Sequence, residues 1–237
     1  MEKNLENKIH SRAKHAMRNK IIAVVVTAAV IVLVLGLMLM HKPEGSSPPA
    51  SVTDGQLSPY LTNVLSPEIY NGIQRQKPFS VTITQQGVND IILHGKWPAM
   101  VNGVSFFAPR VYITEKGIVA MGMVGEAAYT VVAVPCMKKG MMSIPIKTVK
   151  IGAINVTPIV KSFIRKGYER YKKEHSVDSG DIRQTIMSSL IDGKAFEPVF
   201  DIQGKRVRIS KISSNSKEFT LYFEPESPKI AVKKGFF

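Results

Sequence analysis

Residues 21–40 form the longest apolar run in the chain, IIAVVVTAAVIVLVLGLMLM, which contains no charge and no proline. Twenty helical residues rise about 30 Å and match the hydrocarbon core of a bilayer. A cleaved signal peptide is the alternative interpretation, but its apolar stretch spans about 7 to 15 residues and ends at a small-residue site. The nearest such site, Pro48-Pro49-Ala50, has proline where a small residue is needed. The pattern therefore predicts an uncleaved transmembrane helix.

Charged residues on the two sides of this run predict its orientation. Six basic residues lie in the segment 1–20, whereas only Lys42 follows the run before Glu44. Loops that remain in the cytoplasm carry an excess of Lys and Arg. We therefore expect residues 1–20 to form a basic cytoplasmic tail. The chain is then a single-pass protein of the cell (inner) membrane, with its C-terminal part outside the cytoplasm, in the periplasm.

Composition divides the outer part of the chain. Residues 41–56 contain three prolines, two glycines and several small polar residues, without apolar periodicity. Such a segment is typical of a linker. Apolar periodicity resumes at Leu57, so residues 57–225 are expected to form one extracytoplasmic domain, followed by the C-terminal tail 226–237.

Helical and alternating patterns open this domain. Apolar residues in the segment 57–76 recur at helical spacing. A short alternating strand is expected over residues 79–83, and Thr84 is placed to cap the helix that follows. The N-terminal part of the domain is therefore predicted to be a strand between two helices.

The pattern changes to period two between residues 104 and 154. The alternating positions are Val111 and Ile113, then Val119, Met121 and Met123, then Tyr129, Val131 and Ala133, then Ile144 and Ile146. Turn signals such as Lys116-Gly117 and Lys139-Gly140 separate the runs. This region predicts an antiparallel meander of about four strands.

The C-terminal part returns to helical spacing and then to strands. One amphipathic helix is expected over residues 157–174 and a second one ends at Gly193. Three strands are expected over residues 196–202, 206–212 and 218–224. The order of elements places the domain in the α+β class.

The candidate chemistry is sparse. The outer domain contains two histidines, His94 and His175, and one cysteine, Cys136. These are too few ligands for a multi-histidine or Cys/His zinc site, and the motifs of common hydrolases and nucleotide-binding enzymes are missing. We expect Cys136 to be a buried structural thiol and His94 to cap a helix or face solvent. No metal, cofactor or catalytic residue is expected, so the protein is predicted not to be an enzyme.

Basic residues give the chain a formal net charge of +14, and beyond residue 42 there are 25 Lys and Arg against 16 Asp and Glu. Lys and Arg near an anionic membrane surface are attracted to it. The helix 157–174 is the candidate for this contact, because its basic positions adjoin an apolar stripe. The candidate membrane-surface residues are Lys161, Arg165, Lys166 and Arg170. An ordinary core-facing amphipathic helix is the alternative, and nucleic acid is disfavoured as a partner because the domain lies outside the cytoplasm.

Five methionines cluster in the predicted meander: Met121, Met123, Met137, Met141 and Met142. Flexible thioether side chains suit a groove that adapts to variable apolar ligands, and they suit a packed core equally well.

Several segments together resemble a known family. They are FSVTITQQGVNDII at residues 79–92, the meander that includes FFAPRVYITEKGIVAMGMV, IPIKTVKIGAINV entering a helix, and KRVRISKISSNSKEFTLYFEP at the end. The chain resembles the membrane-anchored TULIP-like (tubular lipid-binding) half-barrel proteins of bacterial envelopes. The resemblance implies a highly curved antiparallel sheet packed around one long helix, with an apolar groove for acyl chains and no catalytic residues. The groove residues expected from it are Ile83, Val111, Ile113, Met121, Met123, Phe163 and Tyr168.

Two functions remain open at this point. The first is a non-enzymatic binder of membrane lipid or another amphiphile, which requires an apolar cavity. The second is an interaction or scaffold subunit of a cell-envelope complex for secretion, division or cell-wall synthesis, which requires an exposed apolar patch for protein partners. The oligomeric state is unknown from the sequence.

Overall fold

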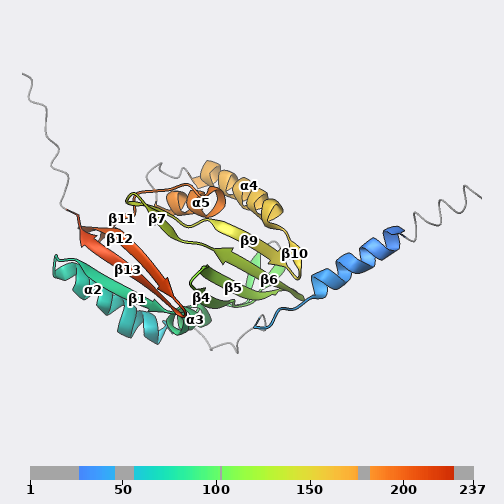
Figure 1. Cartoon of the computed structure of the whole chain (residues 1–237), viewed down its shortest axis with the longest axis horizontal. Coiled ribbons are helices and arrows are strands. Elements are labelled where there is room, and N and C mark those ends of the chain that lie inside the picture. Colours follow the sequence, from blue (N-terminus) through green and yellow to red (C-terminus); the bar gives the residue numbers. More distant parts are fainter. Residues whose placement is uncertain (1–26, 46–55, 102, 176–181, 227–237) are drawn as a thin grey trace, which may run out of the picture.

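Residues 27–45, 56–101, 103–175 and 182–226 are described by a computed structural model (Figure 1). They form an α+β fold in which the paired strands are antiparallel, as the alternating pattern predicts. The expected cytoplasmic tail 1–20, residues 46–55 of the linker and residues 227–237 of the C-terminal tail lie outside the described residues.

Residues 27–40 are helical and extend away from the domain (Figure 1). Within the described residues, no helix combines the length and the apolar character that crossing a membrane requires. Residues 21–26 of the expected transmembrane segment lie outside the described part of the chain. The transmembrane helix therefore stays a prediction of the sequence.

The domain opens with the helices and the strand that the sequence predicts. They are η1 (Leu61–Leu65), α2 (Ser66–Gln74), β1 (Phe79–Thr84) and α3 (Gln85–Leu93). The Thr84 hydroxyl accepts a hydrogen bond from the Gly87 amide at 3.0 Å and so caps the start of α3, as predicted. His94 follows the last turn of α3, where its Nδ1 lies 2.8 Å from the Asp90 carbonyl oxygen. The capping role expected for His94 is thus confirmed.

The predicted meander is the centre of a seven-stranded sheet with the order β10-β9-β6-β5-β3-β2, in which β4 also pairs with β5. Its strands are β2 (Ala99–Val101), β3 (Val104–Phe106), β4 (Arg110–Thr114), β5 (Gly117–Val124), β6 (Ala127–Ala133), β9 (Ile146–Ile151) and β10 (Ile154–Asn155). A separate hairpin of β7 (Cys136–Lys138) and β8 (Met141–Ser143) interrupts the meander between β6 and β9. Cys136 is half-buried in this hairpin, with its Sγ 3.1 Å from the Ser143 hydroxyl, so the expected full burial of this thiol is wrong.

Two helices follow the meander and lie on one side of the molecule (Figure 1). They are α4 (Thr157–His175) and α5 (Ile182–Asp192). The long helix α4 contacts β9 and α5. Its start is fixed by Thr157, whose hydroxyl accepts a hydrogen bond from the Val149 amide at 2.7 Å.

A four-stranded sheet with the order β1-β13-β12-β11 closes the domain. Its C-terminal strands are β11 (Val199–Ile202), β12 (Lys205–Asn215) and β13 (Glu218–Pro225). β11 begins later than the expected Phe196, because Pro198 has no amide for a strand ladder and Phe196 instead forms an isolated bridge with Met142. β1 pairs with β13 along its whole length, which joins the two ends of the domain.

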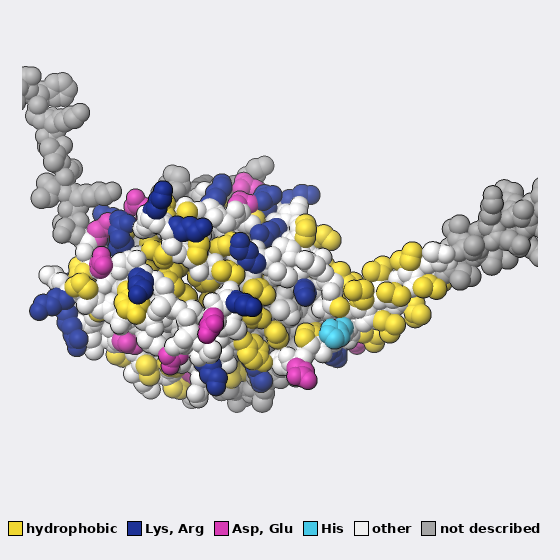
Figure 2. All heavy atoms as spheres, viewed as in Figure 1, with side chains coloured by type: hydrophobic (Ala, Val, Ile, Leu, Met, Phe, Trp, Pro, Cys, Tyr) yellow, Lys and Arg dark blue, Asp and Glu magenta, His cyan; other side chains and the backbone are white. Residues whose placement is uncertain are grey.

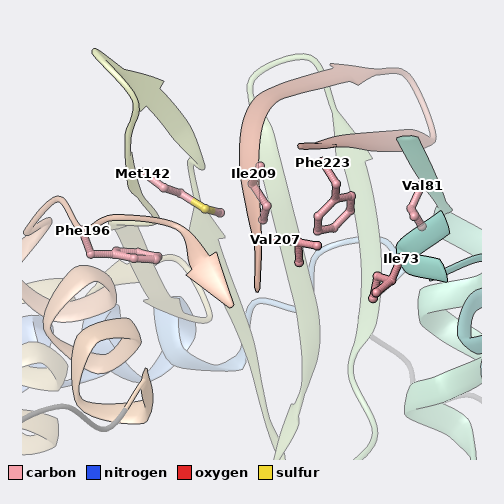
Figure 3. Packing of buried hydrophobic residues seen from close by; sticks show 7 residues of the cluster. All are labelled: Ile73, Val81, Met142, Phe196, Val207, Ile209 and Phe223. Carbon is pink, nitrogen blue, oxygen red and sulfur yellow. The ribbon is translucent and has the colours of Figure 1, made fainter. Parts of the chain in front are cut away.

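The main core lies on the apolar face of the four-stranded sheet (Figure 3). Its buried members are Ile73, Val81, Met142, Phe196, Val207, Ile209 and Phe223. Phe223 also stacks on Phe79 with ring centroids 4.9 Å apart. Burial of side chains of this size stabilises a fold by about 1.5–3 kcal/mol each, so this cluster joins α2, the sheet and the β7–β8 hairpin into one unit.

Candidate functional site

The two sheets turn apolar faces toward each other where β4 and β5 meet β13. Directly opposed residues of paired strands share one face of a sheet. Val111 is opposite Ala120 and Ile113 is opposite Ile118, so these four side chains point the same way. Phe219 of β13 packs against Val111 and Ile113 in a second core cluster. Apolar side chains from both sheets therefore pack against each other here.

A pocket of about 210 Å³ lies beside this cluster, and we name it the intersheet pocket. Its apolar lining residues are Ile118, Val134, Pro135, Met137, Ile212 and Phe219. Glu115, Lys116 and Ser214 are among the polar residues that complete its lining. The pocket is smaller than the roughly 300–1,000 Å³ that is typical of small-molecule sites.

Val111 and Ile113 are the predicted groove residues that the structure brings together. Both are buried, with 6% and 3% of their surface exposed, and they belong to the second core cluster, which lies beside the intersheet pocket.

Met121 and Met123 point to the opposite face of the same sheet. The two-residue turn after β4 pairs Thr114 with Gly117, and this register sets Met121 opposite Arg110 rather than opposite Val111. Because side chains alternate along a strand, neither methionine shares a face with Val111. Met123 is buried on its own face and Met121 is half-buried.

The other three predicted groove residues lie elsewhere. Ile83 packs against the main core cluster on the four-stranded sheet. Phe163 is 66% exposed on α4, and Tyr168 is half-buried on the same helix. None of the seven predicted groove residues, Val111 and Ile113 included, is among the residues that line the intersheet pocket.

A second cleft, of about 560 Å³, lies between the β7–β8 hairpin, β9 and the two helices, and we name it the basic cleft. Lys138, Lys147 and Lys161 line it. Its one acidic lining residue, Asp192, forms an ion pair with Arg165 of α4. Since the Asp192 charge is already paired, the basic cleft presents a net positive lining to a ligand.

Cys136 lines both the intersheet pocket and the basic cleft, so the two hollows adjoin at this residue. A partly apolar pocket beside three lysines offers both apolar contact and positive charge to a ligand. Lys138 and Lys147 were not predicted as site residues, because they lie in different strands and only the fold brings them together.

The four predicted membrane-surface residues fall into two groups. Lys161 lines the basic cleft, and Arg165 is paired with Asp192. Lys166 and Arg170 are exposed. At three- and four-residue spacing they continue the row of side chains that begins with Ile159 and Phe163, so all four residues share the outward side of α4.

Ile159 of α4 is an apolar residue that lies on the surface of the domain. It is 71% exposed, slightly more than Phe163 one turn later. The exposure of such residues could have been predicted from the sequence. The apolar positions of α4 cover a wider arc of the helix than contact with one sheet can bury.

Two titratable groups outside the two hollows have shifted pKa values. The Ser58 hydroxyl donates a hydrogen bond to the Asp90 carboxylate and lowers its pKa, and the Tyr60 amide donates to the same oxygen at 3.1 Å. Burial raises the pKa of Tyr129. The described residues contain no group of three or more His, Cys, Asp or Glu that could hold a metal ion.

Comparison with known proteins does not add a family to this description. A scan against protein-family models and a search of curated proteins each gave no match.

Proposed function

We propose that this protein binds lipid or another amphiphile, without catalysis, on the outer side of the membrane that anchors it. The observation that carries the proposal is the intersheet pocket, whose lining combines apolar side chains of β5, β12 and β13 with polar groups and which adjoins the basic cleft at Cys136.

The half-barrel architecture of the TULIP-like family is part of this proposal. In that arrangement the seven-stranded and the four-stranded sheet would together form the curved antiparallel wall around the long helix α4. The antiparallel pairing throughout, the closure of β1 on β13 and the packing of α4 along β9 support it.

The membrane anchor is the second part of the proposal. Residues 21–40 would span the inner membrane once, with the N-terminus in the cytoplasm and the domain in the periplasm. Large apolar side chains from Val30 to Met40 are exposed over 39–74% of their surface, and Figure 2 shows this helix as a hydrophobic rod that leaves the domain. A bilayer would remove this apolar surface from contact with water, which is favourable.

The basic cleft favours an anionic amphiphile over a neutral one. Three lysines that share one cleft repel each other unless a negative charge lies between them. A phosphate or carboxylate head group would supply this charge, while an acyl chain enters the intersheet pocket.

An interaction or scaffold subunit of a cell-envelope complex is the second candidate function. The observation that favours it is the pair of exposed side chains Ile159 and Phe163 on neighbouring turns of α4, since exposed apolar groups mark interaction surfaces. This reading would need no ligand in the intersheet pocket.

The test is to reconstitute the full chain in nanodiscs that contain a phosphatidylglycerol with a photoactivatable acyl chain, and to map the cross-linked peptides by mass spectrometry. The proposal predicts adducts on β5, β12 or β13 in addition to those on the anchor, and it predicts that unlabelled phosphatidylglycerol competes for them. Adducts confined to the anchor would contradict lipid binding and favour the scaffold function.

A further inference from the structure

The outward side of α4 carries two large apolar side chains on neighbouring turns. Ile159 is 71% exposed and Phe163 is 66% exposed. At a spacing of four residues they lie one above the other on the helix surface and form one continuous apolar strip.

Positive charge continues this strip along the helix. Lys166 and Arg170 are exposed on the same side, three and seven residues after Phe163. In the described part of the chain, neither residue is within ion-pair distance of a carboxylate, in contrast to Arg165, which is paired with Asp192. Helices that lie in a membrane interface combine an apolar strip with basic residues in this way.

The start of α4 lies beside the outer end of the expected anchor. The Ala153 amide in the β9–β10 turn donates a hydrogen bond to the Met38 carbonyl at 2.8 Å. Gly152, in the same turn, adopts a positive φ of 56° and packs so closely on Met38 and Leu39 that a Cβ atom would overlap their backbone. α4 begins at Thr157, only a few residues later.

If residues 21–40 span the bilayer, as proposed, this contact determines how far the start of α4 lies from the membrane surface. Met38 is close to the outer end of the segment 21–40, so a turn bonded to it lies at the membrane surface. With the proposed anchor in the bilayer, this turn and the first turns of α4 would lie next to the lipid head groups.

We propose that the outward side of α4 docks on the outer leaflet of the membrane that holds the anchor. Ile159 and Phe163 enter the interface, and Lys166 and Arg170 contact anionic head groups. This inference rests on the proposed anchor. A lipid surface fits better than a protein partner because the apolar strip begins close to the anchor contact and the unpaired charges continue it along α4.

Docking gives the basic cleft access to membrane lipid. Lys161 lines that cleft from the other side of the same helix, and a helix with its side chains is about 10–12 Å wide. A docked α4 thus holds the cleft within one helix width of the head groups, so a lipid can move from the leaflet into it over a short path.

The experiment places a photoreactive side chain at the docking surface of the full chain. Phe163 is replaced by p-benzoylphenylalanine, the protein is reconstituted in nanodiscs of phosphatidylcholine with phosphatidylglycerol, and adducts are identified by mass spectrometry after irradiation. Tyr70 is 49% exposed on α2, a helix at the end of the domain away from the anchor (Figure 1), and it receives the same replacement as the matched control.

A lipid adduct at position 163 and none at position 70 is the expected result. Lys166→Gln and Arg170→Gln should each lower the adduct yield about fivefold, because a charge at an anionic surface contributes about 1 kcal/mol. Arg165→Gln removes an equal charge that is already paired, and it should leave the yield unchanged. Equal yields of lipid adduct at positions 163 and 70 would overturn the inference.

Irradiation in native membranes separates the other outcomes. A protein adduct at position 163, without a lipid adduct in nanodiscs, would replace the lipid surface by a protein partner. Failure of the chain to enter nanodiscs would overturn the anchor and the docking together. If the pocket strands are still labelled but position 163 gives no lipid adduct, only the docking inference is overturned. If position 163 gives a lipid adduct but the pocket strands are not labelled, only the proposed lipid binding is contradicted.

Discussion

Asn89 of α3 is hydrogen-bonded twice to the main chain of Val111 in β4. Its side-chain oxygen accepts from the Val111 amide at 2.7 Å, and its side-chain nitrogen donates to the Val111 carbonyl at 2.8 Å. One turn earlier, Gln85 accepts from the Ile113 amide at 2.9 Å. β4 pairs with β5 along its other edge. The side-chain amides of Asn89 and Gln85 therefore take the place of a neighbouring strand and hold β4 against the second core cluster.

Asn89→Ala is expected to destabilise the fold by about 1–3 kcal/mol, since it leaves the Val111 amide and carbonyl without these partners. Hydrogen exchange of the full chain in nanodiscs should show faster exchange in β4. Gln86→Ala, at an exposed neighbouring position, is the matched control and should leave β4 protected. Unchanged exchange in the Asn89 variant would show that these bonds contribute nothing to the edge.

Gly72 and Gly167 are both helical, but a methyl group would meet different surroundings at each. At Gly72 it would overlap the ring of Phe79, whereas at Gly167 no atom lies within 4 Å. Gly72→Ala should therefore cost about 1–3 kcal/mol through overpacking. Gly167→Ala should instead stabilise α4 by about 0.4–1 kcal/mol, because it restricts the unfolded chain. Thermal unfolding of both variants checks these opposite signs, and equal shifts would contradict the packing of α2 on β1.

Asp90 gives the protein a specific sensitivity to acid. The hydrogen bond from Ser58 lowers its pKa, so the carboxylate stabilises the fold above the pKa of an unfolded Asp, near 4. This contribution is lost as the pH falls through the lower folded-state pKa. Unfolding followed as a function of pH should show that wild type loses more stability below about pH 4 than Asp90→Asn does. Glu169→Gln on the exposed side of α4 is the control and should follow wild type; identical curves for the Asp90 variant and wild type would remove Asp90 from the acid response.

Lys147 should contribute to the recognition of an anionic head group. Lys147→Gln removes one charge from the basic cleft and is expected to reduce photolabelling by phosphatidylglycerol about fivefold, with little change for phosphatidylcholine. Lys150→Gln removes the same charge from the same strand outside the cleft, and it should leave the labelling unchanged. A parallel loss in both variants would indicate a general surface potential instead of a binding site.

Local elements of this domain follow directly from the sequence. The Thr84 cap and the change of apolar period place α3 and the strands of the meander within a few residues of their observed ends. α4 and α5 also lie where helical spacing predicts them. The positions of helices and strands depend on contacts between residues close together in the chain, and apolar periodicity predicts such contacts well.

Pairings between distant segments were not available from the pattern. The closure of β1 on β13 joins residues that are far apart in the sequence. The two-residue turn between β4 and β5 decides the face of Met121, and alternation alone does not reveal which face that is. The basic cleft likewise depends on Lys138 and Lys161 meeting across different elements.

The most direct test of lipid binding between the sheets uses two neighbouring serines of β12. Ser214 lines the intersheet pocket, whereas Ser213 is opposite Thr220 and points to the other face of the sheet. Ser214→Trp fills the pocket entrance, and Ser213→Trp adds the same bulk outside it. The measurement is the yield of photoactivatable phosphatidylglycerol adducts on β5, β12 and β13 in nanodiscs, with hydrogen exchange of β12 as the folding control. We predict that Ser214→Trp abolishes these adducts and Ser213→Trp retains them; equal adduct yields in the two folded variants would contradict a lipid site between the sheets.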